Sequence, residues 1–228
     1  MSAHKRIVCL ANSRKSGGRC IAGKEFPAPG AWVRPVSARP TAELADQERG
    51  YASGELPQLL DVIDVPVLNR APHTFQAENI QIDLARCWSK VGTLPFHHLS
   101  AFVDPHEPLW PAGHSSGYGS NDRVPLEVAQ TIHSSLRLIQ PEDLIVRVRI
   151  EGKEINEPKR RMRAAFRHCG NFYNLVVTDP DTETLLFAKP DAEYRFPGAF
   201  LCISLGEPLG NWCYKLAASL LLPLSTMG

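Results

Sequence analysis

Three short stretches of the chain combine cationic side chains with glycine or aromatic residues, a pairing typical of sites that bind nucleic acid. In the first, Arg14, Lys15 and Arg19 flank a Ser-Gly-Gly turn. A glycine-bearing loop lets backbone N–H groups approach an anion closely, and neighbouring cations attract it. The pattern predicts a phosphate-contact loop, although it lacks the Gly-Lys-Ser/Thr ending of a Walker A motif. The alternative is a solvated hairpin turn whose glycines only satisfy the backbone geometry.

The second stretch lies on a short predicted strand, where Trp32 and Arg34 alternate with Val33. Residues two apart on a strand share a face, so an indole and a guanidinium lie side by side. This arrangement predicts a platform on which a base could stack. The alternative places Trp32 in the core and pairs Arg34 with a nearby acid.

The third stretch is the densest cationic run. Its members are Lys159, Arg160, Arg161, Arg163 and Arg167. On a strand, Arg161, Arg163 and Arg167 fall on one face, and the apolar residues between them fall on the other. Tyr173 follows across the next turn beside Phe172 and could add a stacking ring. The alternative is an exposed strand that is kept charged to prevent edge pairing.

Other candidate chemistry is weaker. The histidines His97, His98, His106 and His114 cluster in one segment, but their spacing matches no zinc signature, and we expect no metal and no cofactor. Cys20 and Cys213 lie near cations and could be activated nucleophiles, but buried structural thiols are the favoured interpretation. We therefore assign no catalytic residue.

The composition of the whole chain limits the function classes. The 228 residues carry a net charge of only +1, so any nucleic-acid site must be a local patch rather than a global basic field. Nineteen prolines and sixteen glycines favour short strands over long helices. None of the six cysteines forms a C-x-x-C pair, and no apolar run is long enough to span a bilayer. These features predict a cytoplasmic protein with no membrane partner.

The hydrophobic pattern predicts a mostly β protein with two small barrels packed together. Strands are expected within residues 7–10, 19–26, 31–36, 59–68 and 79–84, then within 136–139, 144–150, 161–168, 172–178 and 200–205. Residues 211–222 (NWCYKLAASLLL) are ambiguous between strand and helix. We expect a first barrel over residues 1–85, a long irregular connection rich in Pro, Gly and His over 86–130, with one short helix near 94–102, and a second barrel over 131–228.

Three segments carry a family resemblance. They are residues 7–23 (IVCLANSRKSGGRCIAG) with 32–37 (WVRPVS), residues 159–180 (KRRMRAAFRHCGNFYNLVVTDP) and residues 200–218 (FLCISLGEPLGNWCYKLAA). As a set they resemble the dual OB-containing domain, a family of bacterial conflict and defence systems. The resemblance covers nearly the whole chain. It implies two OB-like barrels and a role in nucleic-acid binding or sensing, with no catalytic residues to carry over.

The prediction from sequence is therefore a non-catalytic module that binds single-stranded DNA or RNA, in a prokaryotic defence system and beside an effector protein. Two alternatives stay open. One is a protein-interaction module, which needs residues such as Trp110 and Tyr118 in an exposed patch. The other is a small-ligand-binding protein or enzyme with a pocket between the two barrels.

Overall fold

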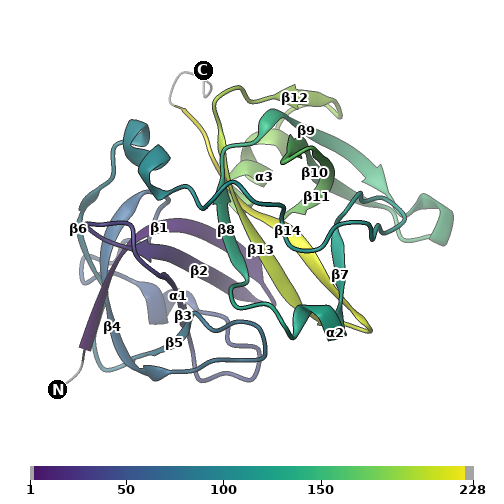
Figure 1. Cartoon of the computed structure of the whole chain (residues 1–228). Helices are drawn as coiled ribbons and strands as arrows, with labels where there is room; N and C mark the ends of the chain where they lie inside the picture. Colours follow the sequence, from purple (N-terminus) through teal and green to yellow (C-terminus); the bar gives the residue numbers. More distant parts are fainter. Residues whose placement is uncertain (1–2, 224–228) are drawn as a thin grey trace. The chain divides into compact units, whose positions relative to one another are not determined.

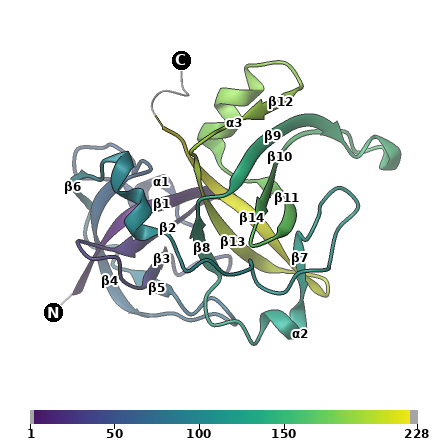
Figure 2. The same cartoon turned by 45° about the horizontal axis from the view of Figure 1, so that its top comes forward.

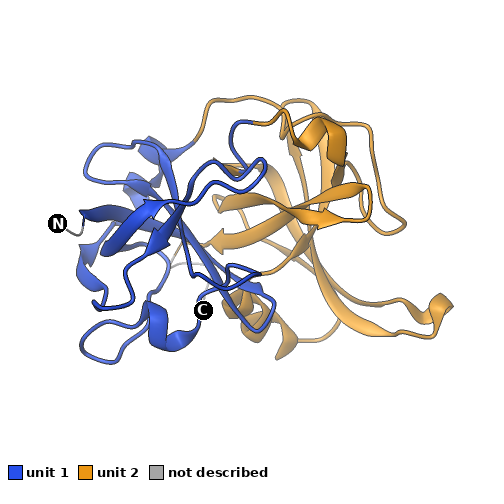
Figure 3. Cartoon of the chain, turned by 90° about the horizontal axis from the view of Figure 1, so that it is seen from below, with its two compact units in different colours: residues 1–103, 133–135 blue, residues 104–132, 136–228 orange. Residues whose placement is uncertain are grey.

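The structure is a computed structural model that describes residues 3–223 of the chain. Strands dominate, which confirms the predicted mostly β class. The chain divides into two compact units, residues 1–103 with 133–135 and residues 104–132 with 136–228 (Figure 3). The segment predicted as a connection, 86–130, is thus shared between the units and contains regular elements of both.

Unit 1 is a closed five-stranded barrel (Figure 1). Its elements are β1 (Ala3–Lys15), β2 (Gly18–Glu25), β3 (Trp32–Val36), α1 (Asp46–Arg49), β4 (Asp61–Arg70), β5 (Asn79–Ile82), β6 (Ser89–Thr93) and the 3₁₀ helix η1 (Phe96–Phe102). The strand order of the sheet is β1-β2-β3-β5-β4-β6; a β1–β4 pairing closes the first five strands of this order into a ring, and β6 is added through its pairing with β4. The β3–β5 pair is parallel and the other pairs are antiparallel.

The first strand closes this barrel because it pairs on both sides. Residues 3–8 of β1 pair with β4, and residues 7–15 pair with β2. A bulge between Cys9 and Ala11 lets the strand bend from one partner to the other. Inward-facing apolar side chains from all five barrel strands, among them Ile7, Ile21 and Ile63, fill the interior.

Unit 2 is built around a larger sheet (Figure 2). Its elements are β7 (Arg123–Pro125), α2 (Leu126–Ala129), β8 (Leu136–Ile139), β9 (Glu142–Glu151), the 3₁₀ helix η2 (Lys153–Ile155), β10 (Lys159–His168), β11 (Asn171–Val177), α3 (Pro180–Phe187), β12 (Glu193–Arg195), β13 (Phe200–Leu209) and β14 (Trp212–Leu221). The strand order is β12-β9-β10-β11-β14-β13-β8, and β7 pairs with β14. The ambiguous segment 211–222 is therefore mainly a strand.

The two units share one topology. In unit 2, β9-β10-β11-β14-β13 repeats the unit 1 order β1-β2-β3-β5-β4, again with a parallel pair between the third and fifth strands. A short helix follows the third strand in both, α1 in unit 1 and α3 in unit 2. β8 pairs with β13 and β9 pairs with β10. These two strands therefore make the pairings that correspond to those of β1 with β4 and β2 in unit 1. Gln140 and Pro141 separate them, and the proline, which has no N–H to donate, interrupts the ladder there.

Gly23 provides a test of barrel closure in unit 1. A Cβ at this position would lie 2.0 Å from the carbonyl oxygen of Val8 in β1, so Gly23→Ala must displace the backbone of the paired strand. We expect it to lower the free energy of unfolding by at least about 2 kcal/mol. Gly17→Ala is the control, because nothing lies within 4 Å of a Cβ there. Urea denaturation of both variants measures this difference, and equal stabilities would contradict the proposed role of Gly23.

Candidate nucleic-acid interface

The tip of the β1–β2 hairpin gathers the three cations of the first predicted site. Lys15 pairs with Gly18 and Arg14 with Arg19, so only Ser16 and Gly17 form the turn. Ser16 has a φ of 48°, which places it in the left-handed region. Arg14 is exposed, and Lys15 and Arg19 are half-buried. We call Arg14, Lys15 and Arg19 the basic hairpin.

A neighbouring segment holds the base of the basic hairpin. The N–H of Arg19 donates to the Leu44 carbonyl at 2.9 Å, and the Leu44 N–H donates back to the Arg19 carbonyl at 2.8 Å. This approach requires glycine at position 18, because a Cβ there would lie 2.5 Å from the Leu44 oxygen. The segment also brings Glu43 close. A hydrogen bond from Thr41 lowers the pKa of Glu43, and the charges of Arg39 and Lys15 lower it further. One carboxylate thus offsets part of the positive charge of the hairpin.

Trp32 and Arg34 occupy different environments on β3. Trp32 is half-buried, and the Nζ of Lys24 lies 5.3 Å from the centre of its ring. Arg34 is only 1% exposed. Its Nη2 lies 3.3 Å from a carboxylate oxygen of Glu78 and donates to the Ser135 hydroxyl at 2.9 Å. The structure therefore shows the alternative in which Arg34 pairs with an acid. The guanidinium of Arg34 is buried and cannot contact a phosphate at the surface.

The predicted basic face of β10 needs a correction. Arg161 and Arg167 are exposed, but Arg163 is only 6% exposed. The guanidinium of Arg163 donates to both carboxylate oxygens of Glu151, at 2.7 and 3.0 Å. Burial alone would raise the pKa of Glu151, but the hydrogen bonds and charges of Arg163 and Arg149 outweigh it and lower that pKa. The alternating pattern does not reveal this, because both faces of β10 are covered near its middle.

A segment of the chain itself covers that outer face. We call residues 116–122 the strap. Ser120 forms an antiparallel bridge with Asn174 of β11, and the Asn174 side chain donates to the Tyr118 carbonyl at 2.7 Å. The Tyr118 hydroxyl accepts from the Gly152 N–H at 3.0 Å. At the far end of the strap, the carbonyl of Asp122 accepts the backbone N–H of Lys215 at 2.8 Å. Tyr118 and Asp122 of the strap therefore lie over Arg163, on the face of β10 that the alternating pattern predicts to be open.

Tyr173 is a core residue. Its side chain is fully buried, its ring stacks on Phe166 with 5.4 Å between centroids, and its hydroxyl accepts the Leu109 N–H at 3.2 Å. Burial raises the pKa of Tyr173. The predicted stacking role therefore cannot fall to Tyr173 in this structure. Its neighbour Phe172 is 38% exposed, on the same hairpin as Arg161 and Arg167.

Sequence reasoning missed one cation–aromatic cluster in unit 2. The guanidinium of Arg123 lies 4.0 Å from the ring centre of Trp212, and the His114 ring lies 5.1 Å from the same ring. Trp212 and Arg123 are half-buried and His114 is exposed. Trp212 begins β14, just after the loop from β13, and β7 brings Arg123 beside it. The residues lie far apart in the sequence, so no local pattern could have predicted the cluster.

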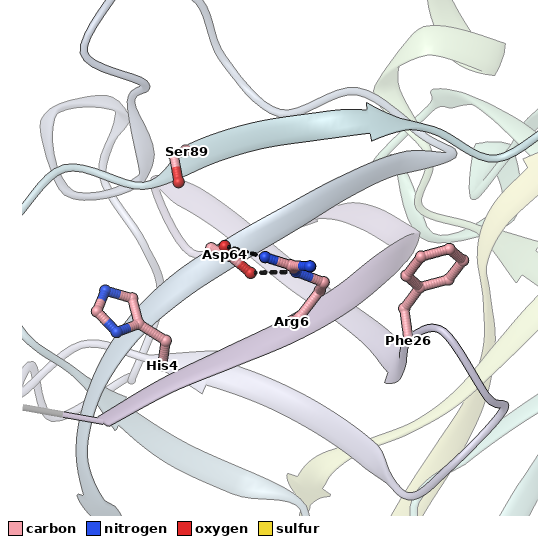
Figure 4. Close-up of a pocket in the computed structure, with 5 residues that line it drawn as sticks. All are labelled: His4, Arg6, Phe26, Asp64 and Ser89. Carbon is pink, nitrogen blue, oxygen red and sulfur yellow. Dashed lines mark hydrogen bonds and ion pairs between the residues drawn. The ribbon is translucent and has the colours of Figure 1, made fainter.

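A shallow pocket of about 460 Å³ lies on the outer surface of unit 1 (Figure 4). His4, Arg6, Phe26, Asp64 and Ser89 line it. Arg6 donates two hydrogen bonds of 2.7 Å to the carboxylate of Asp64, directly across the β1–β4 ladder. The hydrogen bond and charge of Arg6 lower the pKa of Asp64. The acid is therefore held ionised in a cross-strand ion pair.

Each unit has the strand order 1-2-3-5-4 and a helix after its third strand. These features define the class of the protein as double OB-like. The comparison with protein families agrees with this class. The model of the Dual OB-containing domain matches residues 5–220, and the chain belongs to this family. The comparisons with curated proteins and with solved structures gave no significant match. Within residues 3–223, no helix combines the length and apolar character needed to cross a membrane.

The buried pair of Arg34 and Glu78 leads to a stability prediction. Glu78→Gln removes the negative charge and leaves the Arg34 guanidinium buried without its counter-ion, which should cost about 3–5 kcal/mol of unfolding free energy. The matched control is Glu193→Gln, whose pair with Arg147 is exposed and should contribute about 0–1 kcal/mol. Chemical denaturation measures both, and a small effect of Glu78→Gln would contradict a structural role for this pair.

Lys215 leads to a prediction about pH. Its side chain is 1% exposed, its Nζ donates to the Pro111 carbonyl at 2.9 Å, and burial lowers its pKa from 10.5 to about 8. Between these values the unfolded chain binds more protons than the folded chain, so this group makes stability rise with pH. We expect a contribution of up to about 1.4 kcal/mol per pH unit between about pH 8 and 9.5.

The control for this prediction is Lys215→Met, in which that contribution is lost. Other groups also contribute to the pH dependence of stability, among them Cys213, whose pKa burial raises to about 11. They are present in both proteins, so the difference in unfolding free energy between wild type and variant isolates Lys215. A difference that does not change with pH would show that Lys215 keeps its ordinary pKa.

Proposed function

We propose that this protein binds single-stranded nucleic acid and that the basic hairpin of unit 1 makes the main phosphate contacts. The observation that carries the proposal is the position of Arg14, Lys15 and Arg19. They lie at the loop between the first and second strands of an OB-like barrel. This loop is one of the two from which OB folds contact oligonucleotides.

The physical properties of the loop support this function. Two of the three cations lie on β1 and the third lies opposite them on β2, so they occupy one tip rather than a diffuse surface. Cations at such a tip attract the phosphates of a nucleic acid, and their binding releases counter-ions from the nucleic acid. Single strands suit the proposal better than duplexes, because OB folds pair backbone contacts with stacking on unpaired bases.

Unit 2 offers two features for a second contact. Arg161, Arg167 and Phe172 are exposed on the β10–β11 hairpin. The Arg123–Trp212 stack lies next to the loop between β13 and β14, which corresponds to the fourth-to-fifth-strand loop of an OB fold. The alternative of a protein-interaction patch is weaker, because Trp110, which it needs at the surface, is only 8% exposed.

A narrower part of the proposal is that binding serves a prokaryotic defence system, with the chain as sensor and a separate effector protein as partner. The resemblance to a family of conflict systems supports this part. A phage-plaque assay tests it in bacterial cells that carry the chain with its neighbouring genes. Protection that disappears with Arg14→Glu/Lys15→Glu is the expected result, and protection that persists unchanged would contradict a sensing role for the hairpin.

Fluorescence anisotropy with labelled single-stranded DNA, single-stranded RNA and duplex tests the binding itself. We expect Arg14→Glu/Lys15→Glu to weaken single-strand binding at least about tenfold, because two cations become two anions at the proposed interface. The slope of log K against log salt should become shallower by about 0.7 for each phosphate that the variant no longer neutralises.

Two further double variants complete this experiment. Arg161→Glu/Arg167→Glu reports on the second surface, and Lys189→Glu/Arg195→Glu is the control with the same change of charge at exposed positions. An equal loss of affinity in the control would show that only the net charge matters. Absence of salt-sensitive binding to any of the three nucleic acids at low salt would refute the proposal.

A further inference from the structure

Three side chains with metal-binding donors meet at one end of unit 2. His168 is the last residue of β10, Cys169 follows it in the turn to β11, and His106 comes from the segment that precedes the strap. One donor atom from each residue lies within 4.8 Å of the other two. The rings of His106 and His168 also meet edge to face, with 4.9 Å between their centroids.

The hydrogen bonding of His168 prepares it to act as a ligand. Its Nε2 lies 2.9 Å from the carbonyl oxygen of Glu107. A carbonyl can only accept, so Nε2 carries the proton and the lone pair of the neutral ring is on Nδ1. Metal-bound histidines are typically oriented by such a bond from the other ring nitrogen. His168 is only 3% exposed, so its surroundings and this hydrogen bond hold its ring in place.

We propose that His106, His168 and Cys169 form a binding site for a zinc ion. Imidazole nitrogen and thiolate sulfur are the donors that zinc prefers, whereas magnesium and calcium take oxygen ligands. Three protein ligands leave the fourth tetrahedral position for water or for a carboxylate. Glu107 follows His106 in the chain, and Glu142 pairs across the β9–β10 ladder with Arg167, the residue before His168. The negative charge of these two glutamates favours a cation at this place.

The geometry requires only a small adjustment. Bonds of about 2.0–2.1 Å to nitrogen and about 2.3 Å to sulfur place tetrahedral ligands roughly 3.3–3.7 Å apart. Because the donor atoms lie within 4.8 Å of one another, each pair must close by at most about 1.5 Å. His106 is exposed and Cys169 is half-buried, so these two side chains can move toward the fixed His168. Binding would tie the segment before the strap to the β10–β11 turn.

Cobalt(II) and zinc(II) titrations of the whole chain test the site directly. We expect one equivalent of Co²⁺ to give a thiolate-to-metal charge-transfer band that Zn²⁺ displaces, together with a rise in melting temperature on Zn²⁺ addition. Cys169→Ser should abolish the band. Loss of a residue that only hydrogen-bonds to a metal ligand typically weakens metal binding roughly 10–100-fold. His106→Ala removes a ligand itself, so we expect Zn²⁺ binding to weaken by at least that factor.

His114→Ala is the matched control, since His114 is an exposed histidine of the same unit whose ring lies against Trp212, outside this cluster. His106 and Cys169 are the preferred variants because they are more exposed than His168, so the variants should stay folded. No charge-transfer band in the wild type would overturn the proposal. A band that survives Cys169→Ser, or a loss of affinity equal in His106→Ala and His114→Ala, would overturn it as well.

Discussion

Closure of the unit 1 barrel depends on a first strand that is hydrogen-bonded along both edges. In unit 1 a single strand does this, and the bulge after Cys9 lets it turn from β4 to β2. The same bend brings the Val8 carbonyl against Gly23, where no side chain fits. In unit 2, the corresponding pairings are made by two strands on either side of Gln140 and Pro141, β8 with β13 and β9 with β10. The basic hairpin lies at the end of the continuous strand, so the strand that closes the barrel also sets the position of the proposed phosphate contacts.

Covered outer faces explain why so many cations in this chain are structural. A barrel strand normally exposes one face, yet Arg34, Arg163 and Lys215 are buried. Arg34 and Arg163 are each paired with a glutamate, and the Lys215 ammonium donates to a backbone carbonyl. A buried cation without such a partner would carry a large desolvation cost. Basic residues that look alike in the sequence therefore have two different structural roles. Some place exposed charge at a hairpin tip, and others form internal ion pairs under a covering segment.

The sequence predicts the local features of this fold and misses those that depend on distant partners. Alternation over residues 144–150 predicts β9 and the shared face of Arg147 and Arg149, because strand periodicity is a property of neighbours in the chain. The Ser-Gly-Gly turn likewise predicts the basic hairpin. The burial of Arg163 could not be predicted, since Tyr118 and Asp122 come from a segment about forty residues earlier. Asp179 stands before Pro180 in a local sequence typical of a turn, but its side chain caps α3 and also accepts the Leu220 N–H.

The strap limits how unit 2 could take part in binding. The strap adds a backbone bridge to β11, receives the Asn174 side chain and ends at Asp122, whose carbonyl bonds the backbone of β14. Displacing it would expose the ion pair of Arg163 and Glu151 and leave several backbone groups to find new partners, each at a cost of about 1–3 kcal/mol if none is found. The strap is therefore part of the fold rather than a removable cover. A nucleic acid that binds unit 2 would then have to contact exposed or half-buried side chains outside the strap, such as Arg167, Phe172 and the pair of Arg123 and Trp212.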